Sequence, residues 1–164
     1  MNQIGILGVK MPDFKSALSV GKIIENLWLA RLKRKSPMSM IIEGSFKDFD
    51  IYQPEKHLRY EVKSDMKSIH TGNFLIEVEH YKKPSALMTT KADYWVFYDR
   101  YNWIVVPPKK IKDLILTKGY KQVKTTGKGD RHYKLCYLVK KNDIKEIAYV
   151  IKCDKEEVYS GGAS

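Results

Sequence analysis

The chain has 164 residues and a formal net charge of +11, from 30 Lys and Arg residues against 19 Asp and Glu residues. Its 43% hydrophobic and 30% charged residues predict a folded domain and exclude a largely disordered chain. No apolar run reaches the roughly 20 residues of a membrane helix, and no export signal opens the chain. We therefore expect an intracellular protein outside the membrane.

The positive charge favours a polyanionic partner, because each phosphate that binds Lys or Arg releases a condensed counterion. A Lys-rich surface that only keeps the protein dispersed is the alternative. The two cysteines, Cys136 and Cys153, are too few for a disulfide framework and are expected to be reduced core residues.

The first half of the chain predicts a long helix followed by strands. Residues 13–35 are expected to form the helix, which ends before Pro37. Strands are expected at 39–46, at "KDFDIY" (47–52), at "LRYEVKSD" (58–65) and, after a turn at 71–73, at "FLIEVEHY" (74–81).

The second half predicts a short helix, two strongly β-prone runs, another helix and two more strands. These elements are expected at 84–93, 94–100, 103–108, 109–119, 132–141 and 147–153. The order predicts an α/β (α+β) fold with a central mixed sheet flanked by helices. Residues 1–159 are expected to form a single domain, and 160–164 a flexible tail.

An acidic residue lies on the apolar side of the predicted first helix. At 100° per residue, Glu25 falls on the same arc as Trp28 and Leu32. A carboxylate directed into a core must be paired, hydrogen-bonded or bound to a metal. Glu25 is therefore a candidate site residue, and a position at the rim beside a Lys or Tyr is the alternative.

The next two strands carry acids and a lysine on one face. An antiparallel return after Pro54 is expected to bring Asp50 close to Glu61, with Lys63 further along the same face. Mg²⁺ or Mn²⁺ prefers oxygen ligands, commonly one or two carboxylates and a substrate phosphate, and a nearby Lys can orient the attacking water. The pattern predicts phosphodiester hydrolysis. A solvated hairpin with a Glu61–Lys63 salt bridge is the alternative.

These motifs occur in the order that is typical of the PD-(D/E)xK nuclease superfamily, and the chain resembles that superfamily over about residues 20–98. The matching parts are the helix around Glu25, "DI" at 50–51, "EVK" at 61–63 and "SALMTTKADYWVFY" at 85–98. The superfamily includes Holliday junction resolvases, phage recombination nucleases and many restriction endonucleases. The resemblance implies a restriction-endonuclease-like core and a metal-dependent DNA endonuclease, which could act on Holliday junctions or other branched DNA.

By this resemblance Asp50 and Glu61 would ligate Mg²⁺ or Mn²⁺, Lys63 would assist the water, and Glu25 would be a further catalytic acid. The chain departs from the family pattern in two places. Phe49 stands where the family commonly has Pro, so Asp48 remains an alternative to Asp50. An extra strand follows "EVK".

The extra strand raises a second assignment of the metal site. In this assignment Asp65 would be the first acid, and Glu77-Val78-Glu79 would be a Glu-x-Glu form of the second motif. Asp65 and Glu77 could also supply additional oxygen ligands to the first site.

Basic residues in two other regions are candidate contacts to nucleic acid. The second region also contains Gly, Tyr and His residues, so a flexible loop could follow a nucleic-acid backbone. The predicted contacts are Lys82, Lys83, Lys121, Lys124, Lys128 and Arg131. The four histidines lack zinc-like spacing, and no segment resembles a nucleotide-binding loop, so neither zinc nor a nucleotide cofactor is expected.

A homodimer is expected, since one active site per chain must cut two strands of a duplex or junction. The apolar strands at 94–98 and 103–108 are candidates for its interface. The alternative function is a non-catalytic basic nucleic-acid-binding protein of a virus or mobile element. A structural protein whose charge serves solubility is a third alternative.

Overall fold

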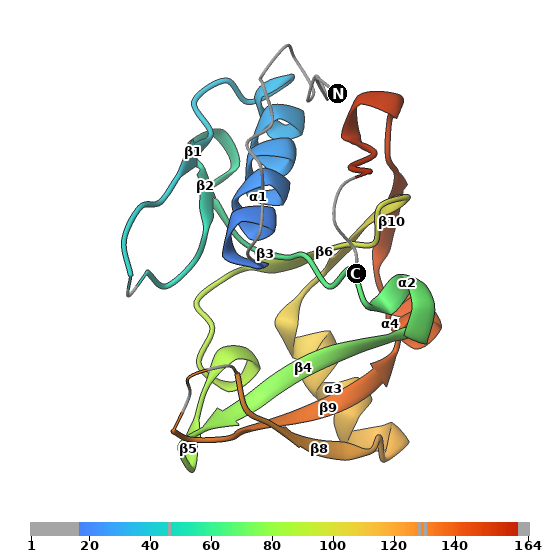
Figure 1. Cartoon of the computed structure of the whole chain (residues 1–164). Coiled ribbons are helices and arrows are strands. Elements are labelled where there is room, and N and C mark those ends of the chain that lie inside the picture. The colour runs from blue at the N-terminus through green and yellow to red at the C-terminus, as the bar shows by residue number, and fades with distance from the viewer. Residues whose placement is uncertain (1–16, 46, 128, 130, 161–164) are drawn as a thin grey trace.

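The computed structural model describes residues 17–160 except positions 46, 128 and 130, and within these residues it has an α/β architecture (Figure 1). The predicted fold class is confirmed. Residues 13–16 of the predicted first helix and most of the predicted tail lie outside the described residues. Within the described part, no helix is long and apolar enough to traverse a membrane.

The regular elements follow in chain order. They are α1 (Ala17–Lys33), β1 (Met40–Ile41), β2 (Ile51–Gln53), β3 (Leu58–Lys63), α2 (Ser68–Thr71), β4 (Asn73–His80), β5 (Lys83–Pro84), β6 (Tyr94–Tyr98), β7 (Asn102–Val106), α3 (Pro108–Lys118), β8 (Gln122–Thr125), β9 (Lys134–Lys140), α4 (Lys141–Ile147) and β10 (Tyr149–Lys152). Short 3₁₀ turns lie at Pro54–Lys56, Ala86–Met88 and Lys155–Glu157.

The strands form two sheets. The larger has the order β1-β2-β3-β6-β7-β10, and the smaller has the order β5-β4-β9-β8. The predicted strand after "EVK" is β4, but it belongs to the second sheet and does not extend the central one. The neighbour of β3 is β6, which runs parallel to it from the pair Tyr60–Tyr94 to the pair Lys63–Phe97.

A hydrogen-bonded ion pair aligns the parallel strands at their first residues. The Asp93 carboxylate accepts from the backbone nitrogen of Arg59 at 2.8 Å and from its Nε at 3.0 Å. These bonds lower the pKa of Asp93. The other described strand pairs are antiparallel.

One core lies between α1 and the six-stranded sheet. Ile24 and Trp28 of the helix pack on Tyr60, Val62 and Tyr98 of the sheet, and all five are buried. The periodicity of α1 therefore reflects this single covered face.

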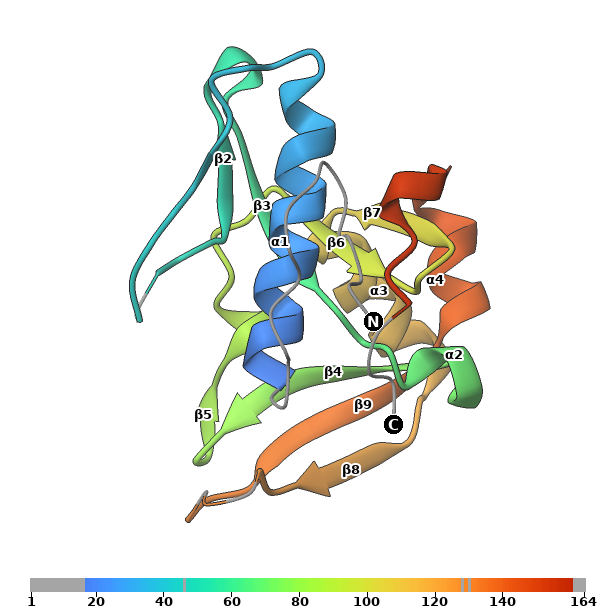
Figure 2. The ribbon, with the colours of Figure 1, turned by 45° about the horizontal axis from the view of Figure 1, so that its top comes forward.

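The second core fills the space between the other face of this sheet, the four-stranded sheet and helices α3 and α4 (Figure 2). Phe97 stacks on Phe74 there, with ring centroids 4.3 Å apart, and Ile111 and Ile144 of the two helices are fully buried. Because β6 is covered on both faces, its sequence is apolar without alternation. The strands at 94–98 and 103–108, which are candidates for a dimer interface by sequence, pack within the two cores, where residues 95–98 and 103–106 are buried.

A buried acid fastens the C-terminal part of the described chain to both α1 and β7. The Glu157 carboxylate accepts hydrogen bonds from Arg31 Nε at 2.9 Å and from Arg31 Nη2 at 2.8 Å. It also accepts hydrogen bonds from Trp103 Nε1 at 3.0 Å and from the backbone nitrogen of Asp154 at 2.9 Å. Glu157 is only 2% exposed. Its hydrogen bonds to Arg31 raise the pKa of the guanidinium.

Candidate active site

The β2–β3 hairpin brings Asp50 beside the strand that carries Glu61. Ile51 pairs with Tyr60, and the backbone nitrogen of Asp50 also donates a hydrogen bond to the Tyr60 carbonyl at 2.9 Å, so the regular register ends at Ile51. The Asp50 carboxylate reaches the backbone of β3, and its charge is close enough to Glu61 to act on it. The predicted hairpin is confirmed.

Asp50 is the buried member of the two candidate aspartates. It is 5% exposed, and its Oδ2 accepts from the backbone nitrogen of Val62 at 2.7 Å. Its Oδ1 lies 2.9 Å from Lys47 Nζ. Asp48 is exposed, so the geometry favours Asp50 as the site residue.

Glu25 reaches the same place from α1. Its Oε1 lies 3.7 Å from Lys47 Nζ, and its Oε2 lies 3.4 Å from Lys22 Nζ. Oε2 is buried and has no hydrogen-bond partner among the described residues. Lys47 thus bridges Glu25 and Asp50, a contact that the sequence analysis missed. Its position three residues before Asp50 was the available signal.

Glu25, Asp50 and Glu61 are called the acid cluster below. Burial raises the pKa of both Glu25 and Glu61, and the nearby charge of Asp50 raises each further. Burial lowers the pKa of Lys47, but the hydrogen bond to Asp50 and the surrounding carboxylates outweigh it, so the net shift is upward. A further positive charge bound at the acid cluster would therefore stabilise its ionised carboxylates.

Lys63 lies beside this cluster on the same strand as Glu61. Its Nζ is 2.9 Å from Glu61 Oε1 and 4.6 Å from the centroid of the Trp95 ring. The ion pair is partly buried, with 31% of the Lys63 and 24% of the Glu61 side chain exposed. The ammonium group is thus held between a carboxylate and an aromatic face.

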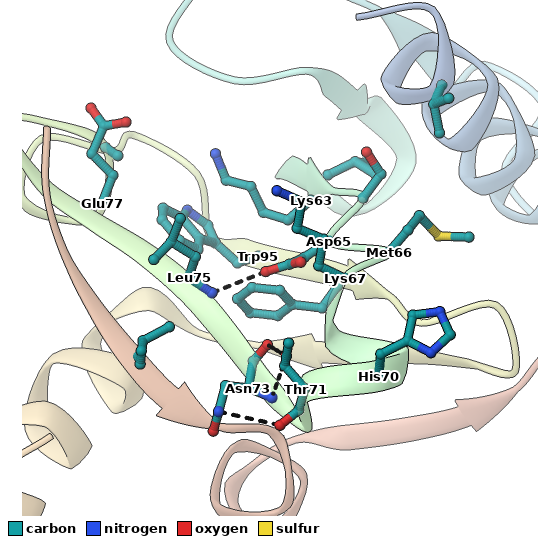
Figure 3. A pocket seen from close by; sticks show the side chains of 16 residues that line it. Lys63, Asp65, Met66, Lys67, His70, Thr71, Asn73, Leu75, Glu77 and Trp95 are labelled. Carbon is teal, nitrogen blue, oxygen red and sulfur yellow. Dashed lines mark hydrogen bonds between the residues drawn. The ribbon is translucent and has the colours of Figure 1, made fainter. Parts of the chain in front are cut away.

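A pocket of about 640 Å³ begins at Lys63 and extends over β4 (Figure 3). Its wall contains apolar residues such as Leu75 and Trp95 together with the polar residues Asp65, Lys67, His70, Asn73 and Glu77. Lys63 is thus shared between the acid cluster and the pocket.

Asp65 and Glu77 line this pocket but turn to separate partners. Asp65 Oδ2 accepts from the backbone nitrogen of Leu75 at 2.9 Å. Glu77 accepts from Ser85 Oγ at 2.7 Å and lies 3.4 Å from Lys134 Nζ. Figure 3 shows Asp65 and Glu77 apart along the wall. The geometry thus gives the second assignment less support than the first.

Among the described residues, no group of three or more His, Cys, Asp or Glu side chains is arranged to hold a metal ion. Mg²⁺ does not need such a group, because it commonly takes one or two protein carboxylates together with waters and substrate phosphates. The oxygens of Asp50, Glu61 and Glu25 are of the kind that a hard cation takes, although Oε2 of Glu25 already lies 3.4 Å from Lys22 Nζ. The Lys47 ammonium already lies between two of these acids and would compete with it.

The predicted nucleic-acid contacts fall mostly at one end of the four-stranded sheet. Lys82 and Lys83 lie at the β4–β5 turn, and Lys124 and Arg131 lie in the β8–β9 hairpin. Lys121 precedes β8 at the opposite end of that strand. Lys128 lies outside the described residues.

The comparisons with known proteins leave the resemblance to PD-(D/E)xK nucleases as a prediction. No protein-family model, no curated protein and no solved structure matches the chain.

Proposed function

We propose that the chain is a Mg²⁺- or Mn²⁺-dependent endodeoxyribonuclease with a restriction-endonuclease-like core. The observation that carries this proposal is the gathering of Glu25, Asp50 and Glu61 around the Lys47 ammonium, with Lys63 paired to Glu61. The electrostatics of the acids support it, since burial and mutual repulsion leave a site that a divalent cation would stabilise. The charge of +11 supports a DNA substrate.

Asp50 and Glu61 would hold the cation, and Glu25 would act as a further acid. The bound metal would lower the pKa of a water and offset the charge that develops on phosphorus. The backbone nitrogen of Val62 fixes the Asp50 carboxylate, so its orientation does not depend on the ligand. Lys63, held by Glu61 and Trp95, is placed to orient the water or to stabilise a phosphate oxygen.

Lys47 neutralises part of the acid cluster when no metal is bound. Its Nζ is close to both Asp50 and Glu25, and its side chain is 20% exposed, so it can turn toward solvent or a phosphate. The Lys47 ammonium would have to leave these carboxylates for a cation to be held there.

The direct test is incubation with plasmid, linear duplex, single strand and four-way junction, in Mg²⁺ and in EDTA. We expect Mg²⁺-dependent cleavage that is lost in EDTA. Because Lys63 stabilises the charge that develops in the reaction, Lys63→Ala should cleave about 10²–10³-fold more slowly. Lys110→Ala, in an exposed lysine of α3, is the matched control. Cleavage that persists in EDTA would contradict the proposal.

A divalent cation should raise the unfolding temperature by an amount that depends on pH. The folded-state pKa values of Glu25 and Glu61 lie above their ordinary value of 4.5. Without metal, the folded state therefore binds more protons than the unfolded chain, and stability falls as pH rises through the window above 4.5. A bound cation favours the ionised forms of Glu25 and Glu61. The increase in unfolding temperature caused by Ca²⁺ should therefore become larger as the pH rises through this window.

Differential scanning fluorimetry with and without Ca²⁺ measures this effect. Glu61→Gln should largely remove the Ca²⁺-dependent increase, whereas Glu146→Gln, which changes an exposed acid in α4, should retain it. An increase of the same size at every pH, or an unchanged increase in Glu61→Gln, would argue against a cation at the acid cluster.

The second candidate is a domain that binds nucleic acid without cutting it. The observation that favours it is the filling of the acid cluster by Lys22, Lys47 and Lys63. This candidate predicts salt-sensitive DNA binding without cleavage under any metal condition. A homodimer remains part of the proposal for cleavage of both strands.

A further inference from the structure

The end of the four-stranded sheet that contains the β4–β5 turn is called the basic end here. It consists of Tyr81, Lys82 and Lys83 from this turn and Lys124, Arg131, His132 and Tyr133 from the β8–β9 hairpin. The two parts touch, because the Tyr81 and His132 ring centroids are 3.7 Å apart and the backbone nitrogen of Tyr81 donates to the carbonyl of Tyr133.

The basic end presents cations around exposed aromatic rings. Lys82, Lys83, Lys124 and Arg131 are all exposed. Lys124 Nζ lies 4.6 Å from the centroid of the Tyr133 ring, which links charge and aromatic surface. Such a surface binds phosphates through its cations and bases through its rings.

Tyr81 is held outward by an unusual backbone. Its φ is 53° and that of Lys82 is 59°, so both residues occupy the left-handed region in a two-residue turn. Asn and Gly are the residues that normally occupy such a turn, and a bulky side chain there is an outlier. Tyr81 is 57% exposed, and its ring packs on that of His132. Backbone strain of this kind clusters at functional sites.

An exposed ring favours nucleic acid with unpaired bases. In a duplex the bases are already stacked on each other, whereas an unpaired base can stack on an aromatic side chain. The basic end therefore suits a single-stranded segment better than an intact duplex.

The strand β4 connects the basic end to the pocket beside Lys63. Leu75 and Glu77 line the pocket, and the same strand leads directly into Tyr81. At about 3.3 Å per residue, Leu75 and Tyr81 are roughly 20 Å apart along the strand. Figures 1 and 2 show the β1–β2 loop and both parts of the basic end on the same side of the molecule.

We propose that the basic end binds a single-stranded DNA segment by stacking an unpaired base on Tyr81. The cleavage substrate would then carry unpaired bases near the scissile bond, as a single strand, a flap or a branch does. This second statement rests on the proposed nuclease function, whereas the binding does not.

Fluorescence anisotropy in EDTA tests the binding separately from cleavage, with a labelled single strand and a blunt duplex of the same sequence. Tyr81→Asn removes the ring but suits the turn, so the fold should be kept. It should weaken single-strand binding by about 5- to 100-fold and leave duplex binding nearly unchanged. Tyr81→Trp keeps an aromatic ring at this position and should bind the single strand as the parent protein does. Tyr101→Ala, in the 55% exposed tyrosine of the β6–β7 turn, is the matched control.

Equal binding of the single strand by the parent protein and Tyr81→Asn would overturn the inference, as would equal losses for single strand and duplex. Failure of the nuclease proposal has a different signature. A protein that binds single strands through Tyr81 but cuts nothing in Mg²⁺ or Mn²⁺ would keep the binding site and reject the nuclease. A protein that cuts DNA, and whose substrate preference is unchanged in Tyr81→Asn, would keep the nuclease proposal and reject the role of Tyr81.

Discussion

Asp50→Asn is expected to slow metal-dependent DNA cleavage by about 10²–10³-fold. A metal ion contributes several kcal/mol of transition-state stabilisation, and about 1.4 kcal/mol corresponds to a tenfold change in rate. The substitution removes the charge of a 5% exposed carboxylate that would ligate this ion. Asn still offers an oxygen to the backbone nitrogen of Val62, so the hairpin should keep its register.

Single-turnover cleavage of a labelled DNA substrate gives the rate. Asp48→Asn is the matched control, because Asp48 is exposed two residues earlier in the chain, and this variant should cut at the parent rate. The double variant Asp50→Asn/Glu61→Gln should be much less than additive if the two acids hold one ion. If Asp48→Asn cut slowly and Asp50→Asn cut at the parent rate, Asp48 and not Asp50 would be the site residue.

Glu157→Ala is expected to lower the free energy of unfolding by about 3–5 kcal/mol, because removal of one partner leaves the other buried and unpaired. The lost carboxylate accepts from Arg31, from Trp103 and from a backbone nitrogen. The Trp103 ring is fully buried, so its Nε1 cannot readily recover a hydrogen bond from water.

Urea unfolding followed by tryptophan fluorescence measures this loss. Asp154→Asn is the control, since the Asp154–Arg34 pair is 44–49% exposed and solvent should replace it with a far smaller change. Glu157→Gln keeps the shape and some hydrogen bonds and should fall between the two. A Glu157→Ala midpoint equal to that of Asp154→Asn would show that the segment does not secure α1.

Local patterns predicted most of the regular elements. The helical period placed α1 with Ile24 and Trp28 inward, and the apolar runs placed β6 and β7. The helix predicted at 109–119 corresponds to α3, which begins one residue earlier at Pro108 and ends before Gly119, whose φ is 64°. These elements carry their signal within a few residues, so they could be recognised without knowledge of their neighbours.

The partition into two sheets had no local signal. Alternation in "FLIEVEHY" indicates which side chains are buried, as Phe74 and Ile76 are, but it does not identify β9 as the partner strand. The predicted strand at 39–46 shrinks to β1, and the predicted helix at 84–93 is only a 3₁₀ turn. Strands β5 and β8 and helix α4 were missed because they are short and contain few apolar residues.

The candidate site was predictable where it depends on regular structure. Strand alternation and the short hairpin predicted that Asp50 lies beside β3, where its carboxylate accepts a hydrogen bond from Val62, and the helix phase predicted an inward Glu25. Lys47 was missed since it acts from an irregular loop. The contact between Tyr81 and His132 was missed because no periodicity relates residues in two separate turns.

The parallel pairing of β3 with β6 has a consequence for biosynthesis. The β2–β3 hairpin can close as soon as it emerges, but the other edge of β3 has no partner until residues 94–98 follow. At about 5–20 residues per second, that edge stays open for several seconds on the ribosome. The charged side chains of Glu61 and Lys63 would then discourage edge-to-edge association between nascent chains.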